Sequence, residues 1–108
     1  MNLRFAAHSI RVRVSKEEFE QLHSGKALGL EVSLPRGHVF RAKVNQSNTN
    51  EWQFDSDPTG LWLSIPRSEL DTLAGALPAR EGVTRAFGTN HGELQVSLEV
   101  DVKSSMGA

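Results

Sequence analysis

Apolar and polar residues alternate along much of the chain with a period of two, the pattern of strands whose sheet has one buried face. The clearest run is Ile10-Arg11-Val12-Arg13-Val14, whose apolar residues point to one side and whose arginines point to the other. The other predicted strands are residues 30–34, 40–44, 52–55, 61–65, 83–87 and 94–102. Pro35-Arg36-Gly37 separates two of them and predicts a hairpin there.

A short helix is predicted directly after the first of these strands. Ser15 with Glu18 three residues later forms a capping box, in which each side chain satisfies a free amide of the other residue. Phe19 and Leu22 then share one face, and Gly25 lies where a left-handed cap ends a helix. We therefore expect two to three helical turns that pack on the sheet.

A second helix is predicted after the strand at 61–65. Pro66 suits the first turn of a helix because its φ angle is fixed near the helical value. Leu70, Leu73 and Leu77 follow at helical spacing, and Pro78 ends the pattern. Both helices are too short to be stable alone, so each must dock on the sheet.

The two halves of the chain resemble each other. Residues 12–22 align with 63–73 without a gap, and residues 40–44 align with 96–100 after a small shift. This similarity indicates an internal repeat of strand-pair, helix, strand-pair units, or convergence of two amphipathic strand–helix segments. The predicted fold is a single α+β domain with a mainly antiparallel sheet or partly closed barrel and two short helices.

Composition bounds the domain and its environment. The chain has 108 residues, of which 38% are hydrophobic and 23% charged, as in one globular domain. We expect one domain over 1–103, with repeats near 1–45 and 50–102 and a disordered tail at 104–108. The absence of cysteine excludes disulfides and thiolate sites and fits a reducing compartment. No membrane-length apolar run or secretory signal is visible, so we expect a cytoplasmic protein that does not enter a membrane.

Motifs for catalysis and cofactor binding are missing from the sequence. It contains no phosphate-binding glycine loop, dinucleotide-binding fingerprint, nucleophile elbow or zincin motif. Its four histidines lack the spacing that places two imidazoles on one metal ion. The sequence therefore assigns no catalytic residue, cofactor or metal ligand.

Basic residues cluster on the polar side of two predicted strands. Arg11 and Arg13 project from one strand, and Arg41 and Lys43 project from another. If the two strands are neighbours, these four residues form one patch that binds anionic ligands or nucleic acid. The alternative is ion pairing across strands with the acidic residues on the same face, Glu31, Glu93, Glu99 and Asp101.

Trp62 is the candidate interface residue. Its neighbours Leu61 and Leu63 face the predicted core, so the alternation turns Trp62 outward. An exposed tryptophan on a sheet is typical of a binding surface. The alternatives are that a loop covers Trp62 or that a bulge changes the register. Trp52 and Phe54 share a face and are predicted to be core residues.

The opening of the chain carries a family resemblance. It contains Leu3-Arg4-Phe5, then His8-Ser9-Ile10-Arg11-Val12-Arg13-Val14-Ser15, then Glu18, Leu22 and Gly25. These residues resemble the start of an uncharacterised family of small bacterial proteins. That family has a basic-apolar strand, an Asn-Ser turn and an Ile-Arg-x-Arg-Leu strand that enters a short helix, with Gly-Asn where this chain has Ala7-His8. The resemblance implies a bacterial cytoplasmic protein and no particular activity.

Three functions remain open from the sequence. The first is a non-enzymatic domain that binds another protein or a second copy of itself through a surface containing Trp62. The second is binding of nucleic acid or an anionic ligand by the basic strands. The third is a small enzyme with an unrecognised site.

Overall fold

The structure, a computed structural model, describes residues 1–78 and 81–101. Its elements in chain order are β1 (Asn2–Ala6), β2 (Ser9–Val14), α1 (Lys16–His23), β3 (Leu28–Ser33), a 3₁₀ turn (Pro35–Gly37), β4 (Val39–Ser47), β5 (Gln53–Asp57), β6 (Gly60–Pro66), α2 (Arg67–Ala76), β7 (Val83–Thr89) and β8 (Gly92–Val100). Val102, the end of the last predicted strand, and the predicted disordered tail lie outside the described residues.

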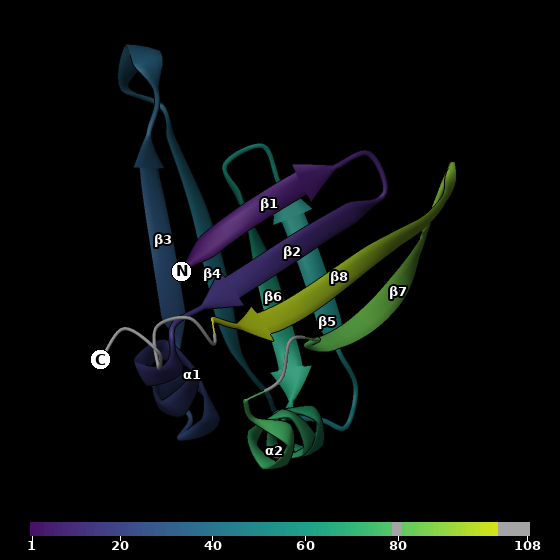
Figure 1. Cartoon of the computed structure of the whole chain (residues 1–108). Helices are drawn as coiled ribbons and strands as arrows, with labels where there is room; N and C mark the ends of the chain where they lie inside the picture. The colour runs from purple at the N-terminus through teal and green to yellow at the C-terminus, as the bar shows by residue number, and fades with distance from the viewer. Residues whose placement is uncertain (79–80, 102–108) are drawn as a thin grey trace.

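The strands form two four-stranded sheets that face each other (Figure 1). Sheet A has the order β1-β2-β8-β7, and sheet B has the order β3-β4-β6-β5. Neither sheet closes on itself, so the α+β prediction is confirmed as two open sheets rather than a barrel. The outer pairs of each sheet are antiparallel, whereas the central pairs, β2 with β8 and β4 with β6, are parallel.

Each sheet is therefore assembled from both halves of the chain. The hairpin of β1 and β2 pairs with the hairpin of β8 and β7, and the hairpin of β3 and β4 pairs with that of β6 and β5. The helices α1 and α2 pack at the same end of the two sheets (Figure 1). Local alternation specifies the hairpins, but the parallel central pairs join segments that are distant in the sequence.

Helix α1 begins as its sequence predicts. The Ser15 hydroxyl accepts a hydrogen bond from the Glu18 backbone N–H at 3.1 Å, and the Glu18 carboxylate accepts one from the Ser15 N–H at 2.9 Å. Gly25 follows the end of the helix with a φ of 102°, the left-handed conformation that glycine adopts most readily. The capping box and the glycine cap are thus confirmed.

Helix α2 is shorter than predicted by one residue at each end, because Pro66 and Leu77 are cap residues with an extended backbone. Pro66 is the N-cap residue with an extended backbone, and the helix begins at Arg67. Pro66 is also the last residue of β6, so its conformation is set by pairing with Ser47 rather than by the helix. Leu70 and Leu73 are buried as expected, and the helix ends at Ala76, before Pro78.

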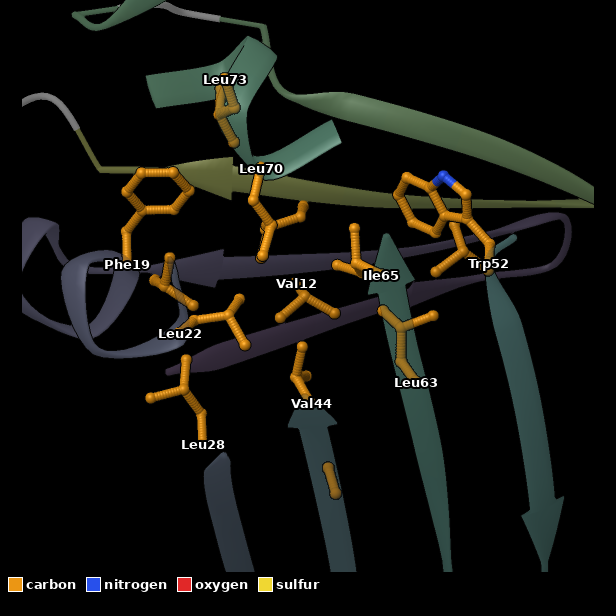
Figure 2. Packing of buried hydrophobic residues seen from close by; sticks show 14 of the residues in the cluster. Val12, Phe19, Leu22, Leu28, Val44, Trp52, Leu63, Ile65, Leu70 and Leu73 are labelled. Atoms are coloured by element: carbon orange, nitrogen blue, oxygen red, sulfur yellow. The ribbon is translucent and has the colours of Figure 1, made fainter. Parts of the chain in front are cut away.

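The core lies between the two sheets and is closed at one end by the helices (Figure 2). Val12 of sheet A and Val44 of sheet B are both fully buried near its centre, and Phe19 and Leu70 come from the two helices. Trp52 is 9% exposed, which confirms its predicted place in the core. Burial of apolar surface at about 25 cal/mol per Å² is the main force that holds the sheets together.

Residues matched between the two halves occupy corresponding positions. Val12 pairs with Leu98 on the parallel strand of its sheet, and its match Leu63 pairs with Val44. By this register Val44 corresponds to Leu98. The sequence alignment instead matches Val44 with Val100, which lies two residues further along β8. The difference preserves which side chains face inward because a strand repeats every two residues.

Candidate binding surface

The outward faces of the two sheets carry the residues singled out from the sequence. Register partners across all four strands define one central row on each face. The central row of sheet A is Arg4, Arg11, Ser97 and Thr84. The central row of sheet B is Asp55, Trp62, Lys43 and Gly29.

On sheet A, Glu99 of β8 neutralises part of the arginine charge. Its two carboxylate oxygens each accept a hydrogen bond of 3.0 Å from the Arg11 guanidinium, and Arg13 Nε lies 4.0 Å away. The hydrogen bonds that Arg11 donates to Glu99, and the negative charge of Glu99, raise the pKa of Arg11. The Glu99 side chain is 13% exposed whereas that of Arg11 is 46% exposed, so the guanidinium lies nearer to solvent.

Arg4 adds a further positive charge to this face of sheet A. Arg4 on β1 is the direct register partner of Arg11 on β2, which places two like charges opposite each other. Within residues 1–78 and 81–101, Arg4 forms no ion pair. Arg4, Arg11 and Arg13 therefore lie together on this part of sheet A, where Arg11 and Arg13 approach the Glu99 carboxylate.

The four residues predicted as one basic patch are not neighbours. Arg11 and Arg13 lie on β2 of sheet A, whereas Arg41 and Lys43 lie on β4 of sheet B. The alternation correctly turned all four outward, but it carries no information on which strands pair. The predicted ion pairing across strands is confirmed at Glu99, and at Glu31, whose carboxylate accepts a 3.0 Å hydrogen bond from Arg41 Nε.

Trp62 projects from the middle of the outward face of sheet B and is 36% exposed. Strand β6 pairs without interruption with β4 and with β5 on either side of Trp62, so no bulge redirects the side chain. The adjacent Leu61 and Leu63 are buried, as the alternation predicts. Trp62 is thus an exposed aromatic residue on a regular, open sheet.

A shallow hollow lies beside Trp62. It has a volume of about 310 Å³, and its lining includes Gly29, Lys43, Arg41 and the edge of Trp62. A side chain built on Gly29 would meet no atom within 4 Å, so the missing side chain leaves the hollow open. The hollow is large enough for one side chain of a docked molecule.

Two acidic residues on the outward face of sheet B flank Trp62 on the side opposite Lys43. Neither was predicted as a binding residue. Asp55 is the register partner of Trp62, and Asp57 is the partner of Gly60. Hydrogen bonds from the Thr59 hydroxyl and the Thr59 backbone N–H lower the pKa of Asp57, so its carboxylate stays ionised. The tight turn from Asp57 to Gly60 fixes the register of this hairpin, and it could therefore have predicted that both residues lie beside β6.

A second, larger hollow of about 700 Å³ lies at the far end of sheet B. It is lined by the hairpin turn around Pro35 and by the β5–β6 turn at Pro58 and Thr59. Among the described residues, the ionisable residues that line it are His38 and Arg41, and Arg41 already bonds Glu31.

A family of unknown function, DUF7009, matches residues 1–105. The chain belongs to this family. No curated protein and no solved structure matches the chain. Membership of DUF7009 confirms the predicted uncharacterised family and supplies no activity.

Two further observations concern other classes of function. Within the part of the DUF7009 domain that the structure describes, no three His, Asp or Glu residues are grouped so as to hold a metal ion. No helix among the same residues has the length and apolarity needed to cross a membrane.

Proposed function

We propose that this DUF7009 domain is a non-enzymatic protein-interaction domain that docks its partner on the outward face of sheet B. The observation that carries the proposal is Trp62, an exposed tryptophan at the centre of a regular sheet face. Tryptophan is enriched among the residues that contribute most to protein binding because it buries a large area with few rotatable bonds. The hollow beside it gives a partner side chain a place to insert.

Charges around Trp62 support a specific rather than a purely apolar contact. Lys43 lies on one side of the indole and Asp55 on the other, each a register partner of Trp62. A central aromatic residue with a charged surround is the usual organisation of a transient protein interface. The charges select the partner and its orientation, and burial of the indole supplies most of the affinity.

We also infer that the domain is an internal repeat. The support is the gapless match of residues 12–22 with 63–73 and the same order of antiparallel, parallel and antiparallel pairs in both sheets. Duplication would give one fold two equivalent outward faces that can diverge separately. On this account the face with Trp62 and the face with Arg11 serve different purposes.

Photo-crosslinking in cells tests the interaction surface directly. Lys43→p-benzoylphenylalanine places the reactive group beside Trp62, and Thr84→p-benzoylphenylalanine is the matched control on the central row of sheet A. The proposal predicts discrete protein adducts from position 43 and none from position 84, and it predicts that Trp62→Ala abolishes them. Equal adducts from both positions, or none from position 43, would contradict it.

A second candidate, binding of a phosphate-bearing anion on sheet A, is favoured by one specific observation. Arg4 lies opposite Arg11, a repulsive arrangement that a bound anion would relieve. The hydroxyls of Ser97 and Thr84 share that row and can donate to phosphate oxygens. The face carries no aromatic side chain in its central row, so contacts would be to phosphate rather than to bases.

The anion hypothesis is tested by titrating a labelled single-stranded oligonucleotide at low salt. Arg4→Ala should weaken binding and reduce the slope of log K against log salt by about 1, as expected for one lost phosphate contact. Arg41→Ala removes the same charge from sheet B and is the control. Equal effects of the two substitutions would place no site on sheet A.

We keep the bacterial cytoplasm as the proposed compartment. The cysteine-free composition fits a reducing environment, and the opening residues resemble a family of small bacterial proteins. Cell fractionation with an antibody to the native protein checks this, since recovery outside the cytoplasmic fraction would contradict it.

A further inference from the structure

We propose that the molecule docked on sheet B is a second copy of the same chain, related to the first by a two-fold axis that runs along β6. The inference rests on the proposed function, because it names the occupant of the same surface. It is carried by the arrangement of charges on that surface, which is complementary to itself.

The charges on this face are separated by strand. Arg41 and Lys43 project from β4, and Asp55 and Asp57 project from β5. Strand β6 runs between them, with Gly60 and Trp62 at the matching levels. Across the face from β3 to β5, one level reads Glu31, Arg41, Gly60, Asp57 and the next reads Gly29, Lys43, Trp62, Asp55.

A two-fold axis along β6 exchanges the two flanks of this face. When two copies meet face to face around that axis, the β4 flank of each lies over the β5 flank of the other. Lys43 then faces Asp55 of the second copy, and Arg41 faces Asp57 of the second copy. Trp62 lies on the axis and meets its own counterpart, which makes the contact isologous and closed.

The groups required for these contacts remain available. Lys43 and Asp55 form no ion pair among residues 1–78 and 81–101. Arg41 uses its Nε on Glu31, which leaves the terminal N–H groups of its guanidinium for a second carboxylate. The hydrogen bonds from Thr59 keep the Asp57 carboxylate ionised.

The other outward face does not pair with itself in this way. The central part of sheet A carries Arg4, Arg11 and Arg13, and the Glu99 carboxylate beside them already bonds Arg11. Two such faces would bring guanidinium groups together and repel each other. Docking of sheet A on sheet B of another copy would be heterologous and would build a ring or a filament rather than a two-fold dimer.

The size of the face predicts a weak dimer. Strands β3, β4, β6 and β5 have 6, 9, 7 and 5 residues, so with about 4.8 Å between strands and about 3.3 Å per residue the face measures roughly 20 by 22 Å, or about 450 Å² in projection. A standard stable interface buries about 800 Å² on each partner. We therefore expect dissociation constants of about 10 µM or weaker, so that dimers form only at high local concentration.

Sedimentation velocity across a concentration series, with charge-swapped variants, tests the inference. The wild-type chain should convert from monomer to dimer as its concentration rises. Lys43→Asp or Asp55→Lys alone should weaken the dimer at least about tenfold, because each places like charges together twice around the axis. The double variant carrying both changes should restore it, and circular dichroism of each single variant checks that the single variants fold.

Other outcomes separate this inference from the proposed function. A wild-type chain that stays monomeric up to about 1 mM, or a double variant no better than the single variants, overturns self-docking. If crosslinks at position 43 then join the chain to a different protein, the docking surface stands and only its occupant changes. Dimers that survive Trp62→Ala as well as Lys43→Asp form through another surface and overturn the inference.

Discussion

Arg11 and Trp62 occupy corresponding places in the two sheets. Each projects outward from the strand that enters a helix, and each has an antiparallel register partner on one side and a parallel partner on the other. The partners of Arg11 are Arg4 and Ser97, and those of Trp62 are Asp55 and Lys43. Corresponding backbone positions thus lie in a row of positive charge on sheet A and in a row on sheet B where a tryptophan stands between a negative and a positive charge.

The close approach of β4 and β6 predicts a strong effect of Gly60→Ala. A Cβ at this position would overlap the backbone carbonyl oxygen of Arg41, which a side-chain movement cannot relieve. We expect the free energy of unfolding to fall by about 2 kcal/mol or more, as for other overpacked sites. Urea denaturation of the purified variant measures this loss.

Gly29→Ala is the matched control for that substitution. Gly29 also lies in sheet B, but a Cβ there meets nothing within 4 Å. We expect unfolding free energies within about 1 kcal/mol of wild type, since removing a glycine also restricts the unfolded chain. Equal losses for the two variants would contradict the register of β4 with β6.

The hydrogen bonds that the Glu18 carboxylate accepts predict that the protein loses stability in acid. Burial raises the pKa of its carboxyl, but hydrogen bonds from the Met1 α-ammonium and the Ser15 N–H outweigh this and lower it overall. A lowered folded-state pKa adds stability above the unfolded value of about 4.3, and this stability is lost as the pH falls through the folded-state pKa. Glu18→Gln should cost about 1 to 2 kcal/mol at pH 7.

Urea unfolding of wild type and Glu18→Gln at pH 7, 5 and 3 checks the direction. The difference in unfolding free energy should persist at pH 7 and 5 and shrink at pH 3, because the stability that comes from a lowered pKa is lost below the unfolded value. A difference that stays constant with pH would show that the Glu18 charge contributes nothing.

Adjacent residues of α2 should differ sharply in their contribution to stability. Leu70 is 0% exposed and packs in the core, so Leu70→Ala should cost about 3 kcal/mol. Asp71 ties α2 to α1 through a 2.6 Å contact of its Oδ1 with His23 Nε2, but its side chain is 56% exposed. Asp71→Ala should therefore cost less than about 1 kcal/mol. Chemical denaturation compares them, and similar losses would contradict the helix orientation.

Local sequence signals predicted the elements of this fold well. Alternation in residues 10–14 gave β2 and its buried face, and the pair of Ser15 and Glu18 gave the start of α1. Both features depend on residues that are close in the chain. The alternation around Trp62 likewise gave its outward direction, because the direction of a side chain depends only on the parity of its position.

Strand neighbours could not be predicted in the same way. The parallel pairs β2 with β8 and β4 with β6 join distant segments, and alternation specifies a face without specifying a partner. For this reason Arg11 and Arg41 were expected in one patch but lie on different sheets. The position of Arg4 opposite Arg11 likewise depends on the register of the β1–β2 hairpin, which the alternation in Leu3-Arg4-Phe5 does not specify.

Quenching of Trp62 fluorescence tests whether a second copy of the chain covers this residue. Trp52→Phe leaves Trp62 as the only tryptophan in a chain without tyrosine, so its emission reports on the outward face of sheet B alone. Acrylamide quenching is then measured while the protein concentration rises from about 1 µM to about 1 mM, the range expected for weak association. If a second copy covers Trp62, the quenching constant falls and the emission shifts to shorter wavelength as dimers form. A quenching constant that is unchanged over the whole range would contradict it.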